Sequence, residues 1–273
     1  MKYKAILAKT SALVAVLGLC ASGAFAAATA YDTSANYTGG WSDTTSPNLG
    51  SGFGAWTIVD NNLNPPYAGT YLDLASYSNP DTVLTGGSAW GVYANGAANA
   101  FINISRAFNT DGSSASLNNQ TFSFAFNSSG IGGTGQSIGL GVGTAFSLGY
   151  AGGGADNMTL SVDGGAANPV SVNYTQMAAG INVALTVTGP LNSATEGYSL
   201  VISPFAGGPA LYSASGTFDS SAYDTSSFML AVNNTSANQY FNNLSISAVP
   251  EPASMVMLGF AGLTTLLAIR RRK

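Results

Sequence analysis

Apolar residues in the central part of this chain recur at every second position, and no long stretch shows the 3.6-residue period of a helix. Such alternation puts apolar side chains on one face of a strand and polar side chains on the other. The clearest runs are Phe122, Phe124 and Phe126, then Ile181, Val183, Leu185 and Val187. Many short strands without intervening helices predict an all-β fold, an antiparallel β-sandwich or jelly roll.

Turn residues separate the alternating runs. Asp163-Gly164-Gly165 is the strongest hairpin signal, because the tight turns of hairpins favour Asp-Gly and Gly-Gly pairs. The segment from Gly130 to Gly154 is rich in glycine and has two interpretations. It is either a flexible loop or a set of strands around Ile138, Leu140 and Val142 with glycines on the crowded face.

Residues 1–26 have the pattern of a secretory signal peptide, with three lysines, an apolar middle at 11–19 and a small-residue cleavage site. Signal peptidase is the expected partner, and the expected cleavage residues are Ala24, Ala26 and Ala27. Lipidation at Cys20 is disfavoured, because Leu19 before it is not small. Cleavage removes the one cysteine, so the body at 27–248 must fold without a disulfide. Its length suits one sizeable core, although length alone does not exclude two smaller domains.

The C-terminal tail, residues 249–273, has three parts in order. Val249-Pro250-Glu251-Pro252 comes first, an uncharged apolar run follows at 253–269, and a basic cluster ends the chain at 270–273. Seventeen helical residues span about 25 Å, slightly less than a bilayer core, and flanking arginines can snorkel to the interface. We therefore expect a transmembrane helix whose basic end stays cytoplasmic.

These three parts together resemble the PEP-CTERM sorting signal. The resemblance implies export across the inner membrane and anchoring by the C-terminal helix. Processing by an exosortase-type enzyme and release to the cell surface or the extracellular space then follow. It does not assign an activity to the body. The residues that the resemblance assigns to sorting and processing are Val249, Pro250, Glu251, Pro252, Arg270, Arg271 and Arg272.

The charge of the body is unusual. Arg106 is the one basic residue between Ala27 and Val249, against eleven acidic residues, which gives a formal charge near −10 from eleven negative charges and one positive. Such a surface is repelled by phosphate backbones, so the sequence predicts no nucleic-acid partner.

Catalytic side chains are scarce in the body. The chain has no histidine, and after cleavage it has no cysteine, which excludes nucleophile–histidine catalysis and His-ligated zinc. The order SGFGAW (51–56), GGSAWGVYAN (87–96), TFSFAF (121–126) and FNNLSI (241–246) is similar to jelly rolls of the concanavalin-like lectin and glucanase kind. Those glucanases carry a Glu-x-Asp-x-x-Glu strand, and here Glu196 is the one body glutamate. We therefore predict that the protein is not an enzyme.

Two candidate ligand sites follow from the composition. Flat rings stack on sugar faces, so Trp41, Trp90 and Tyr93 are candidate carbohydrate-binding residues, with core packing as the alternative for each. Asp60, Asn62 and Asn64 alternate like the oxygen ligands that begin a calcium loop, although the glycine and distal glutamate of an EF-hand are missing. An Asx-rich turn is the alternative there.

These observations predict an exported, non-enzymatic surface or matrix protein that binds carbohydrate or exopolysaccharide. The alternative is a structural protein that associates with itself in the surface or biofilm matrix. A glycoside hydrolase-like enzyme is the third interpretation. Calcium is the one cofactor considered.

Overall fold

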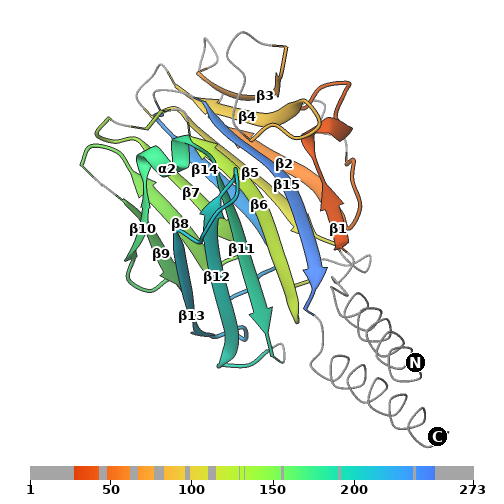
Figure 1. Ribbon diagram of the computed structural model, residues 1–273, viewed down its shortest axis with the longest axis vertical. Coiled ribbons are helices and arrows are strands. Elements are labelled where there is room, and N and C mark those ends of the chain that lie inside the picture. Colours follow the sequence, from red (N-terminus) through yellow and green to blue (C-terminus); the bar gives the residue numbers. More distant parts are fainter. Residues whose placement is uncertain are drawn as a thin grey trace, which may run out of the picture. The chain divides into compact units, whose positions relative to one another are not determined.

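The structure is a computed structural model, and it describes residues 28–42, 48–61, 67–76, 83–95, 99–109, 115–128, 130–131, 133–154, 157–189, 192–235 and 238–249. The described residues form fifteen strands, one short 3-10 helix, η1 (Ser34–Asn36), and one short α-helix, α2 (Tyr174–Ala178). The strands make two antiparallel sheets that pack face to face (Figure 1). The predicted all-β sandwich is confirmed.

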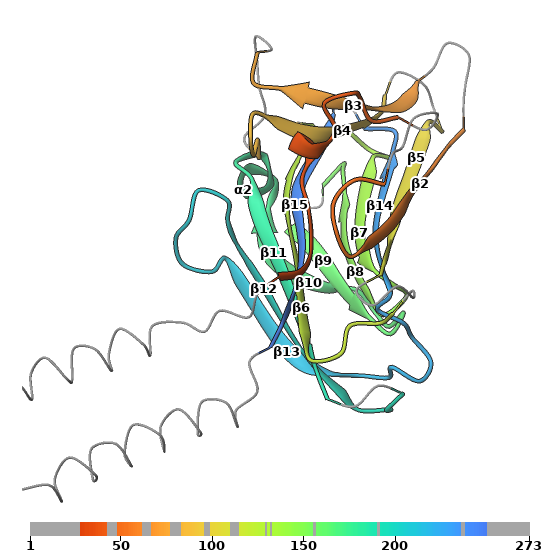
Figure 2. The same cartoon turned by 90° about the vertical axis from the view of Figure 1, so that its right-hand side faces the viewer.

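Sheet A has eight strands and sheet B has seven. The order in sheet A is β13 (Tyr212–Phe218), β12 (Glu196–Pro204), β11 (Ile181–Thr188), β6 (Gln120–Ser128), β15 (Gln239–Ala248), β4 (Ser88–Ala94) and β3 (Ala68–Leu74), with β1 (Ala28–Asp32) also pairing with β15. The order in sheet B is β10 (Asn168–Asn173), β9 (Asn157–Val162), β8 (Phe146–Ala151), β7 (Ser137–Val142), β14 (Ser227–Asn233), β5 (Phe101–Phe108) and β2 (Phe53–Asp60). Figure 2 shows the two sheets nearly edge-on.

Strands β7 to β13 pair mainly with their neighbours in sequence, whereas the last two strands, β14 and β15, lie between strands from earlier in the chain. Strands β7 to β10 form a meander in sheet B, and β11 to β13 form one in sheet A. Strand β14 then lies between β7 and β5, and β15 lies between β6 and β4. The final strands are therefore central, not peripheral.

The core lies between the sheets and is built by the predicted alternation. Phe122, Phe124 and Phe126 of β6 are all buried, whereas Thr121 and Ser123 point to the other face and are less buried. The alternating apolar residues of β11 are buried in the same way. The hydrophobic effect of this shared face holds the sheets together, because no disulfide is possible among these cysteine-free residues.

Two sequence predictions about turns and glycines are resolved. Asp163 and Gly164 have φ values of 55° and 62°, and Gly165 N–H donates to Val162 C=O at 2.9 Å, which is the predicted tight hairpin between β9 and β10. About half of the glycine-rich segment forms strands β7 and β8, so the strand interpretation is correct for that part.

The two ends of the chain lie outside the described residues. The signal peptide, with Ala24, Ala26 and Ala27, and the tail from Pro250, with the transmembrane helix predicted at 253–269, therefore stay predictions. Val249, directly after β15, is partly buried. Within the described part of the chain, every helix is too short to cross a bilayer.

Candidate functional site

The two tryptophans predicted to bind sugar are core residues. Trp41 is 2% exposed and Trp90 is 0% exposed, and both pack with Trp56 and Phe241 in edge-to-face, tilted and stacked contacts. A ring enclosed in this way cannot stack on a sugar, which corrects the expectation for Trp41 and Trp90. Core packing, the alternative for both residues, is the observed arrangement.

Tyr93 has a different environment. It is partly buried on the outer face of sheet A, where its ring lies against Gly69 and near Tyr71, with ring centroids 6.3 Å apart. A β-carbon on Gly69 would come within 2.7 Å of the Tyr93 hydroxyl, so the glycine makes room for the ring. A ligand role for Tyr93 stays a prediction.

The predicted calcium residues are only partly described. Asp60 ends β2, while Asn62 and Asn64 lie outside the described residues. In the described ranges no three Asp, Glu, His or Cys side chains come together as metal ligands. The calcium prediction therefore rests on residues beyond these ranges.

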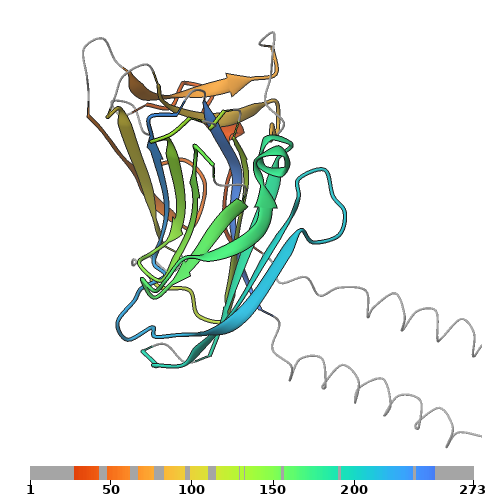
Figure 3. The ribbon, with the colours of Figure 1, turned by 90° about the vertical axis from the view of Figure 1, so that its left-hand side faces the viewer.

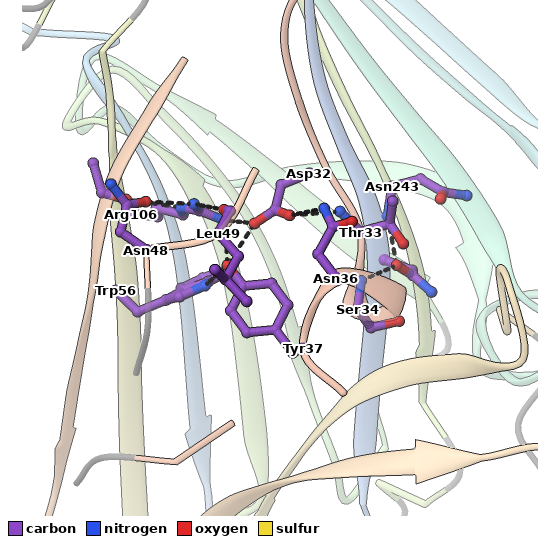
Figure 4. A network of polar contacts seen from close by, with 12 residues as sticks. Asp32, Thr33, Ser34, Asn36, Tyr37, Asn48, Leu49, Trp56, Arg106 and Asn243 are labelled. Atoms are coloured by element: carbon purple, nitrogen blue, oxygen red, sulfur yellow. Dashed lines mark hydrogen bonds and ion pairs between the residues drawn. The ribbon is translucent and has the colours of Figure 1, made fainter. Parts of the chain in front are cut away.

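A buried ion pair between Arg106 and Asp32 lies at the edge of the core (Figure 4). Arg106 is 1% exposed and Asp32 is 0% exposed. Asp32 also accepts hydrogen bonds from Tyr37 Oη at 2.6 Å, Asn36 Nδ2 at 2.7 Å and Thr33 N–H at 2.8 Å. Burial raises the pKa of Tyr37 to about 12, and its hydrogen bond to Asp32 adds to that increase.

The guanidinium of Arg106 is enclosed on every other side. Its Nε donates to Gly54 C=O at 2.9 Å and its Nη2 to Leu49 C=O at 2.7 Å, while its Cζ lies 5.0 Å from the Phe53 ring centroid and 4.8 Å from that of Trp56. These contacts join β5, β2, β1 and the segment before β2. Because the centre is closed to solvent, its role is structural.

An open trough crosses the outer face of sheet B and is the better candidate for a ligand site. Its volume is about 560 Å³. Strand register aligns its outward residues in two rows across the five strands β2, β5, β14, β7 and β8. The first row is Thr57, Ser105, Met229, Gly141 and Ser147. The second row is Val59, Asn103, Ala231 and Gly139, with Gly149 next in register on β8.

Small residues create the trough. Gly139 and Gly141 of β7 have no side chain to fill the space, and Ala231 beside Gly139 contributes only a methyl group. Val59 lies on the edge strand β2 and is 51% exposed, while Met229 lies in the middle of the first row and is 37% exposed. Since adjacent strands are about 4.8 Å apart, the rows extend for roughly 19 Å across the sheet. An extended chain molecule fits this shape better than a single compact one.

The lining of the trough is uncharged and combines polar groups with a larger share of apolar surface. Hydroxyl groups come from residues such as Thr57, Ser105 and Ser147, an amide comes from Asn103, and apolar contact comes from Met229 and Val59. No ionisable side chain is among its described lining residues. Such a surface can hydrogen-bond hydroxyl groups and contact apolar ring faces, but it cannot neutralise a charge.

A second hollow, of about 630 Å³, lies between the segment 34–42, β3 and the turn at 86–88. Trp41 belongs to its wall, but its ring is too enclosed to be a binding platform. Much of this hollow is made by turns, whereas the trough is made by strands. Strands hold side chains more rigidly, so we place the candidate site in the trough.

Glu196, the one glutamate of the body, is not among the described lining residues of either hollow. It begins β12 and is 1% exposed. Burial raises the pKa of this carboxyl group, and the nearby Ser220 hydroxyl partly offsets the increase.

Neither the trough nor the ion pair was predicted from the sequence. A lone arginine in a body of about 220 residues was a usable signal, because a single cation retained among so many neutral residues suggests a specific partner. No comparable signal existed for the trough, because Thr57 and Met229 come together only through the register of three strands.

Residues 248–273 match the family described as the PEP-CTERM protein-sorting motif, in agreement with the resemblance of the tail. No curated protein matches the chain. The body is similar in structure to the Ca²⁺-bound exoplasmic/lumenal domain of VIP36, with a TM-score of 0.43, 7% identity, and coverage of 72% of this chain and 84% of that one. It is also similar to a legume lectin-like domain from Entamoeba histolytica, with a TM-score of 0.44, 8% identity, and coverage of 66% and 90%. A lectin from Bauhinia forficata in complex with GalNAc gives a TM-score of 0.41, 9% identity, and coverage of 81% and 99%. Similarity at this level transfers no ligand to this chain.

Proposed function

We propose that this chain, which carries a PEP-CTERM sorting motif at residues 248–273, displays a body that binds a neutral polysaccharide in the trough of sheet B. The motif indicates an exported protein that is anchored in the membrane and then processed. The single observation that carries the binding proposal is the uncharged trough across five strands, whose lining combines hydroxyl groups with apolar surface.

The negative charge of the body favours a neutral polysaccharide over an anionic one. The body carries a formal charge near −10, from eleven acidic residues and one arginine, and that arginine is already paired inside the core. A polymer rich in uronate or sulfate would be repelled at low ionic strength. A neutral glycan would instead gain hydrogen bonds to Ser, Thr and Asn side chains together with apolar contact to Met229.

The same trough supports a binding protein over a hydrolase. Glycoside hydrolysis requires two positioned carboxyl groups beside the scissile bond. The described lining of the trough contains no Asp or Glu. Absence of catalysis is therefore part of the proposal.

The test replaces Gly139 by leucine, which fills the trough. A β-carbon at this position would have Ala231 Cβ, at 4.0 Å, as its near neighbour, so the backbone can accept it. Gly139→Leu should lower affinity for a neutral exopolysaccharide from the producing cell by more than about tenfold, while the melting temperature stays within a few degrees. Binding is measured by titration calorimetry against a panel of neutral and anionic polysaccharides.

The matched control is Ala184→Leu, which makes a similar enlargement on the outer face of sheet A. It should leave glycan affinity unchanged. Equal loss of affinity in both variants, or binding of anionic polymers in preference to neutral ones, would contradict the trough as the site.

Calcium remains a proposed cofactor through Asp60, Asn62 and Asn64, whose oxygen ligands suit that ion. Millimolar calcium should raise the melting temperature more than the same concentration of magnesium does. Equal shifts would indicate general screening of the acidic body instead of a site.

A further inference from the structure

Among the described residues, the two sheets have five edge strands. Sheet A ends at β13 and β3, with β1 as a further edge strand beside β15, and sheet B ends at β10 and β2. An edge strand presents unpaired backbone N–H and C=O groups that can pair with another strand, and proteins usually protect such edges with charge, proline or an irregular register.

Four of the five edge strands carry such protection. Strand β1 has a register shift to β15 between Ala28 and Ala30. Strand β10 contains Pro169 and its register to β9 shifts between Pro169 and Asn173. Strand β2 has a register shift between Phe53 and Trp56, and β3 contains Asp73. Each of these features disfavours regular pairing with an added strand.

Strand β13 has no such protection. Its seven residues, YSASGTF, include no charge and no proline, and its register to β12 is unbroken. Among the described strands it pairs with β12 alone. Ser213, Ser215 and Thr217 are exposed. Figure 3, with this strand in cyan, shows it at the margin of the sandwich.

We propose that β13 pairs with β13 of a second copy of this chain, antiparallel and around a two-fold axis. The backbone of one strand is complementary to itself in this arrangement, and both open edges are consumed, so assembly stops at a dimer. Sheet A of one copy then continues into sheet A of the other. The trough is on sheet B, so this inference does not depend on the proposed function.

The acidic charge of each body does not prevent a second copy from pairing at β13. The register that pairs all seven residues places Ser215 opposite itself and Ser213 opposite Thr217. The nearest acidic residue in sequence, Asp219, would then lie roughly 26 Å from its counterpart, because eight residue steps of about 3.3 Å separate them. That distance exceeds the Debye length of about 8 Å at physiological salt, so repulsion is screened. The small side chains meet in the middle, where Ala214 lies opposite Gly216, and Tyr212 lies opposite Phe218 at each end.

Single cysteines test this register in the full chain. Opposed residues of an antiparallel pair have Cα atoms about 4.5–5.5 Å apart, which suits a disulfide, whereas Ser213 and its counterpart would be roughly 13 Å apart. The body contains no cysteine, and Cys20→Ser removes the one in the N-terminal segment. The full chain is purified in detergent, treated with a disulfide-forming oxidant and resolved on non-reducing gels.

Ser215→Cys should cross-link to a species of twice the mass, at least about tenfold faster than Ala55→Cys, an exposed position on the edge strand β2. Ser213→Cys should not cross-link by itself but should do so when mixed with Thr217→Cys. This second pair separates a specific register from collisions between exposed thiols.

Three results would overturn the inference. The first is cross-linking of Ser215→Cys no faster than of Ala55→Cys. The second is equal cross-linking of Ser213→Cys alone and mixed with Thr217→Cys. The third is a product whose mass shows a different polypeptide attached at residue 215, which would identify β13 as a docking strand for another protein.

Discussion

Arg106 illustrates how one residue can be decisive in a body with so few charges. Its guanidinium is stable inside the protein because Asp32 supplies the opposite charge and backbone carbonyls accept hydrogen bonds from its other N–H groups. A buried charge without such partners costs several kcal/mol. The pair joins β1, through Asp32, to β5, and the other contacts of Arg106 join residues 48–54 to the same strand.

Asp32→Asn should therefore be strongly destabilising. The substitution keeps the shape of the side chain but leaves Arg106 buried without a counter-charge, so the free energy of unfolding should fall by about 3–5 kcal/mol. Urea denaturation followed by tryptophan fluorescence measures it, since Trp56 lies against Arg106. The double variant Asp32→Asn, Arg106→Met should recover part of the loss. A loss below about 1 kcal/mol for Asp32→Asn would mean that the pair is not held as described.

The contribution of Glu196 to folding stability should depend on pH with the opposite sign to that of a carboxylate whose pKa is lowered by folding. Burial raises its pKa in the folded state above the ordinary value of 4.5. The neutral form stabilises the fold, so this contribution is fully present below the unfolded pKa and is lost as pH rises through the folded pKa. Glu196→Gln should therefore be more stable than wild type at pH 7, and the difference should shrink toward pH 4. Melting curves of both proteins at several pH values measure this difference, and a pH-independent difference would rule out titration of Glu196 as the cause.

At the scale of the strand, the alternation of apolar and polar residues correctly predicted where strands lie when one face of the strand is buried. The strands β6, β11 and β14 lie where Phe122, Ile181 and Phe228 begin their alternating runs. Alternation could not reveal strand order, because β15 inserts between β6 and β4 through contacts more than a hundred residues apart in sequence, as between Ser123 and Ser245. Trp41 and Trp90 were predicted as sugar-binding rings from their chemistry, with core packing as the alternative, since an aromatic ring suits a core as well as a sugar site.

The candidate site could not be recognised in the sequence either, because it too depends on how distant strands are arranged. Each strand of the trough contributes one or two small or polar residues, such as Gly139 and Ser105, which look ordinary in the sequence. Their alignment depends on the register of neighbouring strands, and register is a property of the folded sheet. A short chain segment therefore contains no motif for this site.

Phe124→Ala tests the buried face of β6. The ring is 3% exposed and packs against Phe122 and Phe228, with centroids 5.6 Å and 5.1 Å away. Removing it leaves a cavity between the sheets, so the free energy of unfolding should fall by about 3–5 kcal/mol. The control is Val201→Ala on the outer face of β12, where the side chain is 36% exposed and the loss should be under about 1 kcal/mol. Similar losses for both would contradict the assignment of the two faces.

At the scale of the whole molecule, the tail provides a prediction about processing. Changing Pro250, Glu251 and Pro252 to alanine removes the start of the matched motif but keeps the apolar run at 253–269. The variant should accumulate as a larger, membrane-bound form, because the processing enzyme loses its recognition element. Immunoblots of membrane and released fractions measure this, with Ala253→Ser as a control outside the Pro-Glu-Pro element. Identical sizes and fractions for wild type and variant would refute the sorting assignment.

The central position of β15 also sets the timing of folding during export. Strands β4, β6 and β1 all take β15 as a neighbour, yet β15 is the last strand of the body to be made and the last to cross the membrane. Until residues 239–248 have emerged, sheet A is split into two incomplete halves whose inner edges are open. The sorting motif begins at residue 248, directly where this strand ends. The body therefore stays incomplete for nearly its whole passage, and its inner strand edges stay open until the ten residues of β15 have crossed.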